Sequence, residues 1–315
     1  MRAAVTLLDW IGTRASKALP VGVVLGIGFP KLAEWCQEIM LPALAIPLII
    51  TIVRIHWEHQ FRYLRRWPLL LALTVWVLLA CPVLTWLALQ AFPLHRPLES
   101  AMILAAAAPP LASGAAIALF LGLDAAVIIV GTVFSMFFVP FVLPPLALLL
   151  LGLEIEISLL EFTVRLMALV FGAFLAAFVV KRVLGEARIE RWAMPMDGVS
   201  VILISVFIVA IMDGVTEMGL QRPGYVALTA AMSFALVIGL QALGTGAFWF
   251  LGRHTALAVG LMSGYCNMGL IYLVLGDGAN LDLLAFFGLG QIPMFVLPPL
   301  MGRLYRQVLL EPRRP

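Results

Sequence analysis

The chain has few charged residues, few histidines and few cysteines for its 315 residues. Asp, Glu, Lys and Arg together make up 12% of it, about half the share in soluble proteins, whereas hydrophobic residues make up 63%. A water-soluble fold of this composition lacks the polar side chains to cover its surface. The scarcity of charge therefore excludes a soluble catalytic, nucleotide-binding or DNA-binding domain, and the formal net charge of +3 matters only by its location.

The three cysteines, Cys36, Cys81 and Cys266, lie far apart in the sequence. They form neither a disulfide framework nor a metal-ligand cluster. The chain also lacks an HExxH motif, a CxxC motif and a phosphate-binding glycine loop. These absences predict that the protein is not an enzyme, has no catalytic residue and needs no cofactor.

Long hydrophobic runs are what the sequence does contain. Ten spans of about 20 residues would use about 200 positions, close to the hydrophobic share of the chain. The sequence thus predicts an all-α polytopic membrane protein with ten transmembrane helices. The expected spans are 18–33, 39–55, 67–91, 98–121, 124–151, 157–180, 198–216, 224–251, 254–275 and 282–303.

The distribution of Lys and Arg supports this division. The N-terminus, the loops after the second, sixth and eighth spans and the C-terminus carry 16 of them. The opposite side carries 3, and Arg165 lies within the sixth span. Because basic loops stay in the cytoplasm, both termini are expected to be cytoplasmic in a cell (inner) membrane. Residues 1–16 are expected to form a cytoplasmic amphipathic helix on the membrane surface.

The two halves of the chain share short sequence matches. The hexapeptide FVLPPL occurs at Phe141–Leu146 and again at Phe295–Leu300, an offset of 154 residues. Because each half holds five spans, an odd number, the second half must enter the membrane in the opposite orientation, as in many secondary transporters. We therefore expect a first repeat over 17–152, an inverted second repeat over 153–308 and a cytoplasmic tail over 309–315.

The fourth and ninth spans are each interrupted near the middle. The fourth contains Pro109-Pro110 followed by Gly114, and the ninth contains Gly264 and Asn267. Proline removes backbone donors and clashes with the preceding turn, and paired interruptions in inverted halves point to a substrate site. The residues expected to bind substrate are Pro110, Leu111, Ala112, Ser113, Gly114, Gly264, Tyr265, Cys266, Asn267 and Met268.

Two stretches resemble the bile acid:sodium symporter family. APPLASGAAIALFLGLD (Ala108–Asp124) is similar to the family's PGGTASN segment and the Gly-Asp turn after it, and GLMSGYCNMGL (Gly260–Leu270) is similar to its EVGMQNSGL segment. The resemblance implies a panel and a core subdomain, with the fourth and ninth helices crossing in the core. It also implies transport of bile acids or other small organic anions, usually with sodium.

The match departs from the family at positions that bind sodium in relatives. Gly114 stands for an asparagine, Leu111 for a threonine and Ile128 for a serine, while Met262 replaces a glutamate and Cys266 a glutamine. Sodium needs several oxygen ligands, which thioether and thiol groups replace poorly. The usual sodium coupling is therefore not expected. The oxygen-bearing residues left for a residual cation site are Ser113, Thr132 and Ser263, and Asn267 keeps the residue found beside the substrate.

Three charged residues within the expected spans are candidates for coupling. Glu161 and Arg165 are one helical turn apart and can pair with each other, and Asp213 lies near the end of the seventh span. Charges inside a membrane are functional candidates by default. A structural role near the membrane surface is the simpler explanation for each of them.

The sequence thus predicts a secondary transporter of a small organic anion, working by alternating access. The alternative is a membrane sensor or assembly subunit that keeps the transporter fold without transporting. The expected partners are the anion and the lipid bilayer, with no nucleic acid, and the sequence leaves the oligomeric state, the substrate and the direction of transport open.

Overall fold

The computed structural model describes residues 6, 8, 15–55, 66–111, 113–152, 158–275 and 280–310. These residues are almost entirely helical, and the β-structure among them is one isolated bridge. Most of the expected surface helix in residues 1–16 lies outside the described residues, as does most of the expected tail, residues 309–315.

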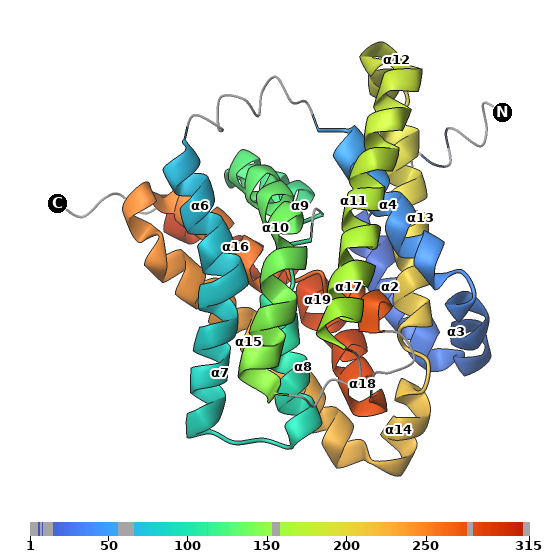
Figure 1. The fold of residues 1–315 in the computed structure, drawn as a ribbon, viewed down its shortest axis with the longest axis vertical. Helices are drawn as coiled ribbons and strands as arrows, with labels where there is room; N and C mark the ends of the chain where they lie inside the picture. Colours follow the sequence, from blue (N-terminus) through green and yellow to red (C-terminus); the bar gives the residue numbers. More distant parts are fainter. Residues whose placement is uncertain are drawn as a thin grey trace.

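Figure 1 shows the helices in their order along the chain. They are α2 (Ala15–Gly28), α3 (Pro30–Gln37), α4 (Met40–Val53), α6 (Trp67–Val75), the π-helical turn η1 (Trp76–Ala80), α7 (Cys81–Ala91), α8 (Arg96–Ala107), α9 (Gly114–Leu121), α10 (Ala125–Leu151), α11 (Leu159–Leu184), α12 (Glu186–Arg191), α13 (Ala193–Ala210), α14 (Val215–Gln221), α15 (Pro223–Ala247), η3 (Trp249–Leu251), α16 (Arg253–Gly264), α17 (Met268–Leu275), α18 (Leu281–Leu289) and α19 (Gln291–Leu310).

Six stretches of helix in the described part are long and apolar enough to cross a membrane. They are Trp67–Ala91, Ala125–Leu151, Leu159–Leu184, Ala193–Gln221, Pro223–Ala247 and Leu281–Leu309. The pair α3 and α4, bent by 67°, makes a seventh if it is counted as one span.

Two further pairs of consecutive helices match each other in length. α8 and α16 each have 12 residues, and α9 and α17, which follow them, each have 8. A 12-residue helix is about 18 Å long and cannot cross a hydrocarbon layer of about 30 Å by itself. Each pair is therefore an interrupted element, and its pieces do not count among the six long helices.

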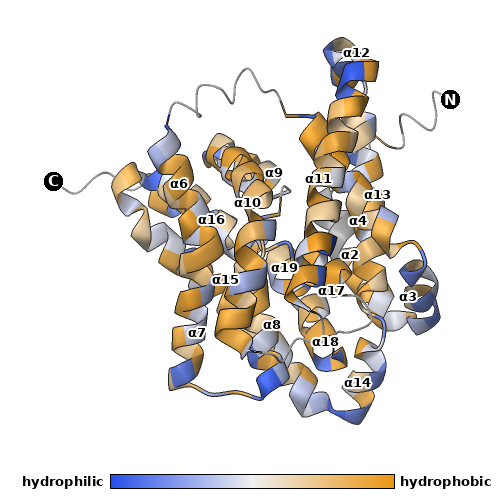
Figure 2. Cartoon of the chain, viewed as in Figure 1, coloured by the Kyte–Doolittle hydropathy of each residue, from blue (hydrophilic) through white to orange (hydrophobic). Residues whose placement is uncertain are grey.

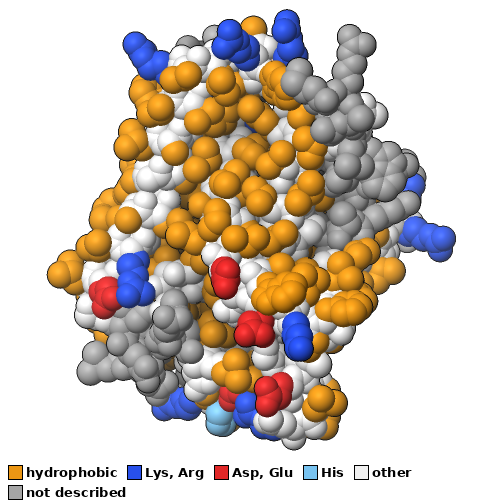
Figure 3. Space-filling view, turned by 90° about the vertical axis from the view of Figure 1, so that its right-hand side faces the viewer, with side chains coloured by type: hydrophobic (Ala, Val, Ile, Leu, Met, Phe, Trp, Pro, Cys, Tyr) orange, Lys and Arg blue, Asp and Glu red, His pale blue; other side chains and the backbone are white. Residues whose placement is uncertain are grey.

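Polar and apolar side chains are separated along the long axis of the molecule. Figure 2 shows hydrophilic residues gathered at the two ends, on α12 at one end and on α3 and α14 at the other. In the space-filling view, hydrophobic side chains cover the middle of the visible face, and Lys and Arg side chains lie at its upper end (Figure 3). A broad apolar belt between polar ends is the surface of a protein embedded in a membrane.

The helices form two groups (Figure 1). The α4 group consists of α2, α3, α4, α11 and α13, and the α10 group consists of α6 to α10, α15 and α16. α17 and α19 each contact both groups, α18 contacts α8 and α15 of the α10 group, and α10 also packs directly against α11 of the α4 group. Within the α4 group, α2 and α13 pack closely because glycines of α2 face α13: an added Cβ would lie 3.0 Å from the Val209 carbonyl at Gly26 and 3.2 Å from the Ser205 carbonyl at Gly22.

Several helix ends differ from the sequence expectation. The expected first span, 18–33, ends at Gly28, and residues 30–33 belong to α3. The expected seventh span, 198–216, is divided by a turn at Ile211–Gly214, where Gly214 has a φ of +74° that favours glycine. The expected boundary between 308 and 309 falls inside α19, which continues to Leu310. The charged residues near the end of α19 do not stop it, because an exposed helix end tolerates Arg and Gln.

Candidate functional site: the crossing of two interrupted helices

The first interruption follows α8. Ala108 has extended backbone angles, φ −67° and ψ 143°, because the residue before a proline is excluded from the helical region. Pro109 and Pro110 then supply no backbone N–H, so the helix cannot continue through them. The chain becomes helical again at Gly114.

The second interruption follows α16 and contains no proline. Tyr265 leaves the helical region with φ −95° and ψ 66°, and α17 begins at Met268. Asn267 stands before the first turn of α17, and its side-chain Oδ1 accepts a hydrogen bond from the backbone N–H of Leu270 at 3.3 Å. This is an N-cap, which asparagine provides well.

The two interruptions lie side by side and bond to each other. The N–H of Leu111 donates to the Tyr265 carbonyl at 2.6 Å, and the N–H of Asn267 donates to the Pro109 carbonyl at 2.8 Å. Pro110 and Cys266 face each other between these bonds as an antiparallel bridge. In this pattern the facing pair uses neither of its own N–H groups, so a proline fits at position 110. We call residues 108–111 and 265–267 the crossing.

The crossing is buried in the molecule. Tyr265 is 0% exposed, Cys266 2% and Asn267 6%. Unwound backbone at membrane depth persists only where protein or a cavity satisfies its polar groups. Here the two unwound segments satisfy each other, which explains why each interruption is stable.

A contact between the end of α9 and the start of α16 shows in which direction these helices run relative to the crossing. Near the start of α16, His254 Nδ1 lies 3.0 Å from the Gly122 carbonyl, and Thr255 Oγ1 donates to Asp124 at 3.5 Å. α9 therefore runs from the crossing to this corner, and α16 runs from the corner back to the crossing. Both α9 and α17 begin at the crossing, so their N-termini, each the positive end of a helix dipole, meet there.

Unpartnered hydroxyl groups lie beside the crossing. Ser113, just before α9, has a buried Oγ without a hydrogen-bond partner, and so has the Oγ1 of Thr132 on α10. α10 passes close by, since a Cβ added to Gly114 would lie 3.6 Å from the Ile128 side chain and 3.7 Å from the Tyr265 ring. A buried hydroxyl without a partner costs free energy, and a bound polar ligand would remove that cost.

The third residue of the expected residual cation site is already engaged. The Ser263 hydroxyl accepts a hydrogen bond from Trp76 Nε1 at 2.9 Å and donates to the Val259 carbonyl at 2.8 Å. Met262, which stands for the family's glutamate, is 1% exposed, and its sulfur lies 2.6 Å from where a Cβ on Gly131 would be. Apolar packing thus occupies the place that the resemblance gives to a carboxylate.

Other expected substrate residues face protein neighbours. The Tyr265 hydroxyl donates to the Met294 carbonyl on α19. The Met268 sulfur lies 2.6 Å from where a Cβ on Gly290 would be, and an added Cβ on Gly264 would meet Val237 and Gln241 on α15. Ala112 lies outside the described residues.

The expected coupling residues are not at the crossing. Glu161 and Arg165 form an ion pair of 2.5 Å with both side chains about half exposed, and Arg165 also donates to the Val274 carbonyl at 3.3 Å. Val274 is about 10 Å of helix beyond Asn267, so Arg165 caps the far end of α17. The Asp213 carboxylate accepts from Gln37 Nε2 at 3.1 Å, outside the crossing.

One residue near the crossing was missed by sequence reasoning. Trp76 is the first residue of the π-helical turn η1, and its side chain hydrogen-bonds to Ser263. In this turn the Cys81 N–H donates to the carbonyl of Trp76, whereas in an α-helix it would donate to the carbonyl of Val77. Pro82 follows directly, and its missing N–H leaves the Leu78 carbonyl without the usual helical donor. The proline within an apolar span was the sequence signal for this turn. The turn draws attention to Trp76 because π-helical turns are frequent at functional sites.

Comparison with known proteins adds no relative. No protein-family model matches the chain, and no curated protein matches it either.

Proposed function

We propose that the protein is a secondary transporter of a small organic anion that works by alternating access. The single observation that carries the proposal is the crossing. Two helices that start at one buried point direct their N-termini toward it, and this arrangement favours an anion. Ser113 and Thr132 contribute hydroxyl groups without partners beside that point.

The proposal includes ten spans arranged as two inverted repeats of five helices. Both halves contain a 12-residue helix, an interruption and an 8-residue helix. In both halves FVLPPL lies in a helix that follows, Phe141–Leu146 in α10 and Phe295–Leu300 in α19. In this proposal α8 with α9 and α16 with α17 each count as one span, and both termini are cytoplasmic in a cell (inner) membrane.

The resemblance to the bile acid:sodium symporter family supports the same assignment. The α4 group corresponds to the panel of that family and the α10 group to its core, with the crossing facing the boundary between them. Gly269, two residues after Asn267, already meets the α4 group, because a Cβ there would lie 2.5 Å from the Phe207 ring and 3.0 Å from Leu44. Movement of one group against the other would open the crossing to either side.

We also propose that transport does not use sodium in the family's manner and that the protein has no catalytic activity or cofactor. Met262 and Cys266 present sulfur at positions that carry oxygen in relatives, and Trp76 occupies the Ser263 hydroxyl. Those side chains lack the carboxylate that a sodium ion needs in a medium of low dielectric constant.

The decisive test compares two substitutions of Asn267. Ser keeps the helix cap but removes the amide donor, whereas Ala removes both, because serine and asparagine cap helices about equally well. In proteoliposomes supplied with labelled carboxylates, from short-chain acids to a bile acid, wild type should show saturable uptake. Asn267→Ser should fold as stably as wild type, yet lose most of this uptake.

The same assay separates transport from the alternative of a sensor or assembly subunit. A protein that binds a carboxylate in a thermal-shift measurement but moves none across the vesicle membrane would be a sensor. Full uptake by Asn267→Ser would show that the side-chain amide does not contact the substrate, and would remove the crossing as its binding site.

A further inference from the structure

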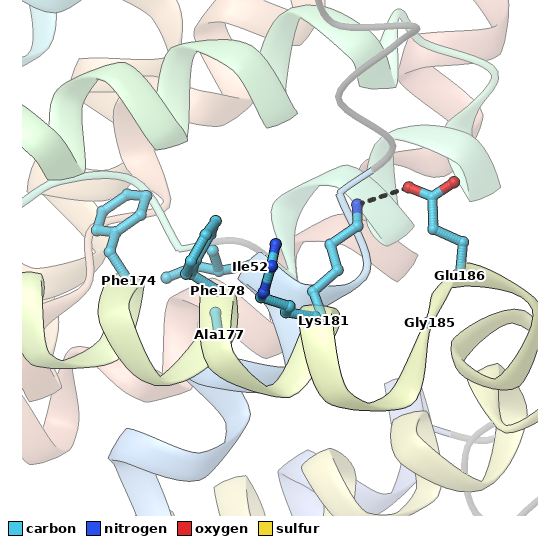
Figure 4. A pocket seen from close by; sticks show the side chains of 8 residues that line it. Ile52, Phe174, Ala177, Phe178, Lys181, Gly185 and Glu186 are labelled. Atoms are coloured by element: carbon cyan, nitrogen blue, oxygen red, sulfur yellow. Dashed lines mark ion pairs between the residues drawn. The ribbon is translucent and has the colours of Figure 1, made fainter.

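A pocket lies on α11, away from the crossing. It has a volume of about 470 Å³, within the range of small-molecule sites. Figure 4 shows the rings of Phe174 and Phe178 projecting from α11 into this space. We call it the α11 pocket; the side chains that line it include Phe174, Phe178, Lys181, Arg182 and Glu186.

The α11 pocket is apolar at one end and basic at the other. Lys181 and Arg182 are in the last turn of α11, and Glu186 at the start of α12 completes the polar end. Lys181 is engaged, because its Nζ donates to the Ile55 carbonyl at 2.8 Å and pairs with Glu186 at 3.2 Å (Figure 4). The ion pairs of the described residues do not involve Arg182. One guanidinium charge is therefore left for a ligand.

The α11 pocket is at the level where lipid headgroups meet the hydrocarbon layer. α11 has 26 residues and is about 39 Å long, which exceeds the hydrocarbon thickness of about 30 Å. The last turn, with Lys181 and Arg182, therefore reaches the headgroup region, while Phe174 lies two turns deeper. Phe178 is 65% exposed, so the apolar part of the pocket is open to the surroundings of the helix.

We propose that the α11 pocket binds an anionic phospholipid. The phosphate would lie on Arg182, whose planar guanidinium matches phosphate geometry, and an acyl chain would lie along Phe178 and Phe174. Basic pockets between membrane helices recognise such headgroups. A lipid fits better than a free anion because the exposed Phe178 ring lets the chain continue into the bilayer. The proposal requires only that the protein is embedded in a membrane, so it does not depend on transport.

Native mass spectrometry of the purified full-length protein in a neutral detergent tests this proposal. The protein is titrated with phosphatidylglycerol, with phosphatidylcholine of the same chains, or with phosphatidylglycerol in the presence of a free single-chain carboxylate. The variants are Arg182→Gln, Phe178→Ala and the control Arg188→Gln, which removes the same charge from the exposed surface of α12. The readout is the fraction of protein that carries one lipid.

Wild type and Arg188→Gln should retain phosphatidylglycerol in preference to phosphatidylcholine. Arg182→Gln should bind phosphatidylglycerol about fivefold more weakly, the weight of one basic residue at a membrane surface, and Phe178→Ala should weaken both lipids. Equal losses in Arg182→Gln and Arg188→Gln would overturn the proposal, because they would indicate general surface charge. Equal retention of both lipids by wild type, or full displacement by the free carboxylate, would overturn the assignment to a phospholipid.

Discussion

Gly264 is one of the positions where the structure leaves no room for a larger residue. It is the last residue of α16. The side of Gly264 that would carry a Cβ packs against α15. A Cβ added there would lie 2.7 Å from the Val237 carbonyl oxygen and 2.7 Å from Gln241 Cγ. Real Cβ atoms do not approach other atoms this closely, and the carbonyl belongs to helical backbone that cannot turn away. Gly264→Ala must therefore separate α15 from α16 by several tenths of an ångström.

The size of this effect can be estimated. Overpacking a well-packed interior costs about 1–3 kcal/mol, and a helical Gly→Ala change by itself gains about 0.5–1 kcal/mol. The net loss is therefore at most about 2.5 kcal/mol. Since about 1 kcal/mol corresponds to roughly 2 °C in a chain of this size, Gly264→Ala should lower the melting temperature by up to about 5 °C. The matched control is Gly239→Ala in the middle of α15, where an added Cβ meets no atom within 4 Å. This control should be as stable as wild type or slightly more stable.

The measurement is thermal unfolding of the purified protein, followed by the fluorescence of its eight tryptophans. The informative quantity is the difference between the two Gly→Ala variants, because both make the same chemical change. If Gly264→Ala melts at or above the temperature of Gly239→Ala, the close contact of α15 with the end of α16 is wrong. The assignment of Gly264 to packing instead of substrate contact would fall with it.

Three further predictions concern the crossing. Replacing Pro109 and Pro110 together by alanine should favour a continuous helix, separate the paired segments and abolish carboxylate uptake; unchanged uptake would contradict the proposed site. Trp76→Phe removes the donor to the Ser263 hydroxyl and should cost about 1–2 kcal/mol, and a thermal unfolding cycle with Ser263→Ala should show that the two losses are not additive. Carboxylate flux should change less than twofold when potassium or choline replaces sodium at fixed pH and osmolarity, whereas a steep, saturable dependence on sodium would refute the ligand argument.

The sequence by itself determined the class of protein and the positions of the two interruptions that form the crossing. A chain with 63% hydrophobic and 12% charged residues has to place its helices in a membrane. The tandem prolines at Pro109-Pro110 end α8 by local chemistry alone, without help from any neighbour. The cap at Asn267 is a similarly local feature, because the capping preference of asparagine is a property of the residue and its own backbone, although we predicted Asn267 only as a substrate residue.

Only the tertiary structure decided how these local features meet. The bond from Leu111 to the Tyr265 carbonyl joins residues 154 positions apart, and no local preference specifies such a contact. Gly264 could have faced a cavity or a helix, and the packing of α15 placed it against Val237 and Gln241. The sequence offers Arg165 as a candidate for coupling, but in the fold its guanidinium donates to the Val274 carbonyl at the far end of α17. Local chemistry determines where a helix breaks, whereas its partners depend on how all the helices pack together.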